Sequence, residues 1–126
     1  MSRLAVVTGD TPIIALDLTD QDSGLVVDLS NAATTIAFKV RVVGSTTLKA
    51  TVACTKLVGR KTPGGAIDSG APYNVVGFGG RCQAECPSTV FDAPGEYEAE
   101  VEVTFGASAR IATVFQLVRI QARAQF

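Results

Sequence analysis

The sequence has 126 residues, of which 47% are hydrophobic and 18% charged, and its formal net charge is −1. A chain of this length fits one domain with its own core, and the near-neutral charge excludes a broad basic surface for nucleic acid or a membrane. Histidine is absent, which excludes histidine-based catalytic triads and histidine metal ligands.

The chain begins MSRLAVVTGD, whose apolar run is too short for a secretory signal, so we expect synthesis in a cytoplasm. Residues 13–19 alternate apolar and polar side chains, which predicts a strand with Leu16 and Leu18 on its inner face. DQDSG at 20–24 predicts a turn, and residues 25–30 predict a short strand or an extended return.

Two further strands are predicted at residues 34–43 and 48–57, where apolar side chains again alternate with polar ones. In the first of them, Lys39 and Arg41 are expected to point outward. The side chains expected to point inward from the two strands are Ile36, Phe38, Val40, Val42, Leu48, Ala50, Val52 and Cys54.

A stretch rich in glycine and proline, GRKTPGGAIDSGAP at 59–72, predicts a loop that is long for a connection within a β-sandwich. Long loops frequently carry function, so Arg60 and Lys61 are candidate interface residues. Residues 73–86 return to strand alternation, and their glycines suggest a bulge or close packing by a neighbouring backbone.

The most regular pattern is EYEAEVEVTF at 96–105, which predicts a strand with its glutamates on one wet face and Tyr97 and Val103 pointing inward. Alternate residues on one strand lie about 7 Å apart, so neighbouring carboxylates do not share a compact cation site. We therefore favour a solvated face that pairs with Lys39 and Arg41 of a neighbouring strand. The alternatives are a cation-binding face and an interface with a basic partner.

The last strand, residues 110–126, changes phase near 117–118, which predicts a bulge or a strand that leaves one sheet. An open edge strand can pair with a neighbouring protein, and this long strand is our first candidate for such an edge. The candidate interface residues on it are Val118, Ile120, Ala122 and Phe126. The N-terminal MSRLAVV and the 59–72 loop are the next candidates.

The chain has three cysteines, Cys54, Cys82 and Cys86, and an odd number argues against a complete set of intrachain disulfides. On an extended strand Cys82 and Cys86 would lie about 13 Å apart, too far to bond, and their spacing does not match a zinc site. We favour buried thiols for Cys54 and Cys82. A Cys54–Cys82 bridge and an intersubunit bridge through Cys86 are the alternatives.

Taken along the chain, these patterns predict an all-β fold, an antiparallel β-sandwich of about seven strands formed by residues 1–126 as a single domain. No set of side chains converges on an active site, and the glycine-rich and acidic motifs lack the spacing of nucleotide or calcium sites. We therefore expect a protein that is not an enzyme and that holds no cofactor or metal.

Two strings of the sequence carry a family resemblance. The first is GDTPIIALDLTDQDSGLVVDLSNAATTIAFKVRV, with a GDT entry at 9–11, an acidic turn, a DL step at 28–29 and a strand reading apolar-x-Phe-x-Val. The second is FDAPGEYEAEVEVTF at 91–105, followed by a strand that contains Phe115, Leu117 and Ile120. Together they resemble the immunoglobulin-like domain at the N-terminus of phage baseplate upper proteins.

This resemblance implies an immunoglobulin-like β-sandwich and a structural protein of a tailed bacteriophage, located in the virion. The implied role is that of a tail, baseplate or neck adaptor that docks, in many copies on a symmetric particle, onto other phage virion proteins through edge strands and loops. A capsid decoration or head-fibre protein is the first alternative, and a carbohydrate- or receptor-binding module is the second.

Overall fold

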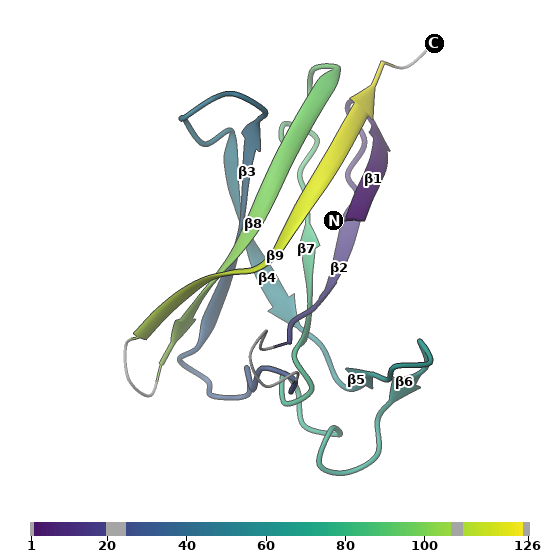
Figure 1. The fold of residues 1–126 in the computed structure, drawn as a ribbon, viewed down its shortest axis with the longest axis vertical. Helices are drawn as coiled ribbons and strands as arrows, with labels where there is room; N and C mark the ends of the chain where they lie inside the picture. The colour runs from purple at the N-terminus through teal and green to yellow at the C-terminus, as the bar shows by residue number, and fades with distance from the viewer. Residues whose placement is uncertain (1, 20–24, 107–109, 125–126) are drawn as a thin grey trace.

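Residues 2–19, 25–106 and 110–124 are described by a computed structural model, drawn as a ribbon in Figure 1. Across these ranges the chain forms strands, turns and loops and no helix, so none of them supplies a helix that could cross a membrane. The strands are β1 (Ser2–Val7), β2 (Ile13–Asp17), β3 (Thr35–Val42), β4 (Ala50–Lys56), β5 (Arg60–Lys61), β6 (Ile67–Asp68), β7 (Arg81–Glu85), β8 (Gly95–Phe105) and β9 (Arg110–Arg123). The prediction of an all-β fold is confirmed.

Seven of these strands form one sheet in the order β1-β9-β8-β3-β4-β7-β2, and β5 and β6 form a separate two-stranded hairpin. Strand β4 belongs to both halves of the sheet, because its residues 50–53 pair with β3 and its residues 54–56 pair with β7. The sheet curls there into a half-barrel, with β8 and β9 in front of β7 and β2 in Figure 1. The fold is sandwich-like as predicted, although one curled sheet replaces two separate ones.

Strands β1 and β9 run parallel, with Ser2 opposite Val118 and Val7 opposite Arg123, whereas the other pairings of this sheet are antiparallel. The expectation of a purely antiparallel sheet is therefore wrong at this edge. The N-terminal run was not predicted as a strand. It becomes one because Leu4 packs against the core from β1 while the main chain pairs with β9.

The core lies between the two halves of the curled sheet, where the inward side chains of the alternating strands meet. Its largest aromatic pair is Phe91 and Tyr97, whose rings meet edge to face with centroids 5.2 Å apart. Two side chains expected inward are instead exposed, Val42 at 44% and Leu48 at 47%. Strand β4 pairs with β3 only as far as Val40, so the positions beyond it lie outside the shared core.

Residues 73–86 differ most from expectation, because only Arg81–Glu85 forms a strand and the preceding residues are turns. Val76, expected inward, is 50% exposed. The close packing suggested by the glycines is confirmed, since a Cβ on Gly79 would collide with the Gly59 carbonyl group. A Cβ on Gly80, at φ +78°, would likewise lie too close to the carbonyl oxygen of Leu18, so this segment follows the neighbouring backbone without adding to the sheet.

The predicted 59–72 loop contains the short β5–β6 hairpin, which stands away from the half-barrel in Figure 1. This hairpin could not be predicted, because strands of two residues are too short to show alternating apolar and polar side chains. Residues 25–30 form an extended return with one isolated bridge, between Thr19 and Val26, and bury Val27 and Leu29. The turn predicted at 20–24 lies outside the described residues.

The phase change predicted in the last strand is confirmed as an irregularity of the β8–β9 ladder. Glu100 lies opposite Leu117, whereas Glu102 lies opposite Thr113, so β9 contributes two more residues than β8 between these pairs. A bulge of this kind bends the strand locally.

Candidate interaction surfaces

Strand β1 forms one edge of the seven-stranded sheet and pairs, within the described residues, with β9 alone. The N–H group of Thr8 donates to the carbonyl oxygen of Arg123 at 2.9 Å, so the even-numbered residues of this segment direct their main-chain groups toward β9. Because these groups alternate in direction along a strand, the N–H and C=O groups of Ala5 and the N–H of Val7 point away from β9. They form an open hydrogen-bonding edge.

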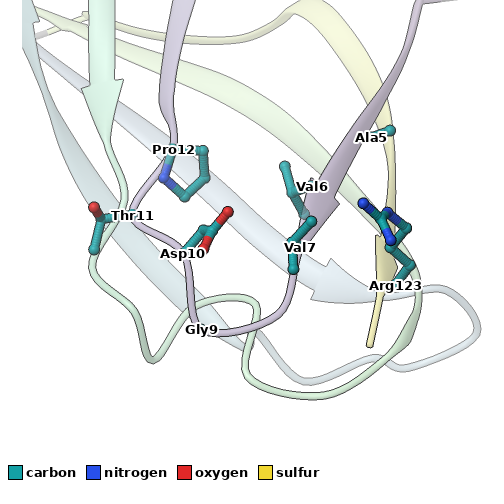
Figure 2. Close-up of a pocket in the computed structure, with 8 residues that line it drawn as sticks. All are labelled: Ala5, Val6, Val7, Gly9, Asp10, Thr11, Pro12 and Arg123. Atoms are coloured by element: carbon teal, nitrogen blue, oxygen red, sulfur yellow. The ribbon is translucent and has the colours of Figure 1, made fainter. Parts of the chain in front are cut away.

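A groove of about 660 Å³ lies beside this open edge, between β1 and the segment that leads into β2. Figure 2 shows Val6 and Val7 in its middle, with Arg123 on one side and Asp10 on the other. The remaining lining residues are Ala5, Gly9, Thr11 and Pro12. The groove therefore offers free main-chain groups, two valines and opposite charges on its two sides.

The edge predicted at the last strand is wrong over its C-terminal part. Val118, Ile120 and Ala122 are 2%, 0% and 3% exposed, and their main chain pairs with β8 on one side and β1 on the other. Their side chains point to the core, and β1 covers the main-chain edge of β9 that would otherwise be open. The fourth candidate, Phe126, lies outside the described residues.

The candidates Arg60 and Lys61 lie on β5 and line a second groove, of about 530 Å³, together with Tyr73 and Phe78. The Arg60 guanidinium lies 4.5 Å from the centre of the Tyr73 ring, and its Nε lies 3.3 Å from a carboxylate oxygen of Asp68. These contacts fix Arg60 in the groove wall. Asp17 and Asp28 add carboxylates to the same lining, so this groove combines aromatic surface with both signs of charge.

The glutamate face of β8 is paired with cations, as predicted. Nζ of Lys39 lies 2.8 Å from Glu102, and Arg41 lies 2.6 Å from Glu98. Arg119 approaches the second oxygen of Glu98 at 4.0 Å from the other side. Within the ranges that the structure describes, no three histidine, cysteine or acidic side chains are grouped so that they could hold a metal ion. The face is a cross-strand ladder of ion pairs.

The three cysteines are free thiols, and the favoured burial is confirmed for Cys82 but not for Cys54. Cys82 and Cys86 are buried and Cys54 is half-buried. Burial raises the pKa of the Cys86 thiol to about 11. The alternative of an intersubunit bridge through Cys86 does not fit this structure, because the side chain is only 2% exposed.

No known family model matches this chain, and no curated protein is significantly similar to it. The function is therefore inferred from the surfaces described above and from the sequence motifs.

Sequence reasoning ranked β1 behind β9 and did not single out Ala5, Asp10 or Arg123. The N-terminal apolar run was the one available signal for this edge. Alternation shows which side chains share a face, but it does not show which strand lies at the end of a sheet.

Proposed function

We propose that this protein is a docking subunit of a tailed-phage particle, of tail, baseplate or neck, and that it binds a neighbouring virion protein by strand addition at β1. The observation that carries the proposal is the open edge at Ala5 and Val7 beside the 660 Å³ groove. Main-chain groups of this kind supply affinity for an extended segment, and flanking pockets supply its specificity. The resemblance to the baseplate upper protein domain supports the phage assignment, and neither feature involves catalysis.

The occupant that fits the groove is an extended segment of a partner chain, with opposite charges at its two sides. An acidic side chain would face Arg123 and a basic side chain would face Asp10, on opposite sides of the groove. A small apolar side chain of the segment would lie over Val7. Repetition of the subunit around a symmetric particle would let modest individual contacts add up.

The test is incorporation of an Ala5→Pro variant into particles. Proline removes the outward N–H of Ala5, which forms no bond to β9, and proline is tolerated on edge strands when the lost N–H faces solvent. In a phage lacking the gene and complemented in trans, we expect about tenfold less variant than wild type in purified particles, as measured by quantitative mass spectrometry. The isolated variant should keep the wild-type circular dichroism spectrum.

The matched control is Ala5→Val, which keeps the N–H group and favours strand structure, and it should be incorporated like the wild type. Equal incorporation of Ala5→Pro would refute docking through β1. Absence of the wild-type protein from particles would refute the virion role itself. Immunogold labelling of the tail supports the adaptor role, whereas labelling of the head would select the capsid decoration or head-fibre alternative.

A carbohydrate- or receptor-binding role is the second candidate, and the groove at Tyr73 favours it. Aromatic rings, carboxylates and threonine hydroxyls along one groove are the groups that sugar sites use. A saturable glycan-array signal that is lost in Tyr73→Ala and retained in Ala5→Pro would establish it. The absence of any glycan signal would remove it.

A further inference from the structure

Two of the three cysteines lie where β4 leaves β3 and begins to pair with β7, and Cys86 follows directly after β7. Cys54 lies opposite Ala84, and Lys56 lies opposite Cys82. Because alternate residues share a face, Cys54, Cys82 and Ala84 lie on the same side of the β4–β7 pair, facing the core. Cys54 is thus a diagonal neighbour of Cys82 in one direction and of Cys86 in the other.

The electrostatics of the two diagonals differ. Hydrogen bonding between Cys54 and Cys82 lowers the pKa of Cys54 and, together with burial, raises the pKa of Cys82. Burial is the main cause of the raised pKa of Cys86, and the charge of Cys54 adds to it. Cys54 is also the only half-buried thiol of the three, so it is the one that a reagent reaches first.

We propose that Cys54 and Cys82 are an intrachain disulfide pair that closes when the protein meets a small-molecule disulfide, with Cys54 as the attacking sulfur. In the first step the Cys54 thiolate displaces one thiolate from the reagent and forms a mixed disulfide. In the second step the Cys82 sulfur, after losing its proton to solvent, attacks the Cys54 sulfur and releases the second thiolate. The two protein thiols are oxidised, and one small-molecule disulfide is reduced to two thiols.

The bridge would join the two strands at the bend of the curled sheet, and it would close a loop that contains the β5–β6 hairpin.

The experiment treats the folded full-length protein with oxidised glutathione, blocks the remaining thiols by alkylation, and maps the peptides without reduction. Trypsin leaves Cys82 and Cys86 in one peptide, so the digest adds a protease that cleaves after Glu85 and separates them. We expect one cross-link, Cys54 to Cys82, with Cys86 alkylated after denaturation. Cys86→Ala should form the same cross-link as the wild type.

Cys82→Ala should stop at the mixed disulfide, carrying one glutathione on Cys54. A Cys54–Cys86 link, a link between two chains, or three alkylated thiols in the treated wild type would each overturn the proposal. So would a Cys54–Cys82 link that forms only in protein unfolded by urea. The wild-type map alone decides between these outcomes if a cysteine variant fails to fold.

Discussion

Single residues set the closest approaches in this fold, and Gly79 is the clearest case. Its Cα lies against the Gly59 carbonyl, so the turn segment that precedes β7 packs directly on the backbone that enters β5. Tyr97 shows the opposite situation, a large buried side chain with its polar end satisfied. Its hydroxyl donates to the carbonyl oxygen of Ala93 at 2.7 Å.

Gly79→Ala should therefore destabilise the protein by about 1–3 kcal/mol, because an added methyl group forces backbone apart in a packed region. Urea unfolding at neutral pH measures the free-energy difference. Gly64→Ala is the matched control, since the nearest atom to its added Cβ is 4.0 Å away, and it should stay within about 0.5 kcal/mol of wild type. Equal values for the two variants would contradict the packing of Gly79 against Gly59.

At the scale of elements, the outer face of the β3–β8–β9 region is held by charge pairing across strands. Glu98 accepts from Arg41 on one side and faces Arg119 on the other, and its side chain is only 14% exposed. Glu100, on the same face of β8, forms no ion pair among the residues that the structure describes. The two glutamates thus form a natural comparison.

Glu98→Gln should lower the unfolding free energy by about 1 kcal/mol, at the upper end for surface pairs, because two arginines lose their shared carboxylate. Glu100→Gln should change it by less than about half of that. In 1 M salt the difference between the two variants should shrink, since screening weakens such pairs. Salt-independent values would show that the ladder acts through packing and not through charge.

The alternation of apolar and polar side chains predicted the strands that bury one face. It failed where apolar side chains lie in turns. The strand at 96–105 and its pairing with Lys39 and Arg41 could be predicted, because every second residue there is apolar. The apolar residues at 75–76 do not belong to a strand, because they lie in turns whose glycines adopt positive φ. The groove at β1 could not be predicted, because it depends on which strands become neighbours.

At the scale of the whole molecule, β1 is the edge strand that pairs with β9 and completes the curled sheet. It is placed by main-chain pairing to residues 118–123 and by the half-buried side chains Leu4 and Val6. Without β1, strand β9 would present its own unpaired edge, and unpaired edges promote association between chains.

Deletion of residues 1–7 should thus lower the unfolding free energy by about 2 kcal/mol or more, from lost apolar burial and lost pairing. It should also shift the protein toward larger species in size-exclusion chromatography. A synthetic peptide of residues 1–8, added in excess, should raise the melting temperature of the truncated protein, whereas the reversed peptide should not. A truncated protein as stable and as monomeric as the full chain would show that β1 is dispensable.

The parallel pairing of β1 with β9 also has a consequence during translation. Residues 2–7 leave the ribosome before their partner residues 118–123, which follow only after more than a hundred further residues. At ordinary elongation rates this delay is on the order of ten seconds. For that time the apolar residues of β1 have no partner strand, so the nascent chain exposes a surface of the kind that chaperones bind.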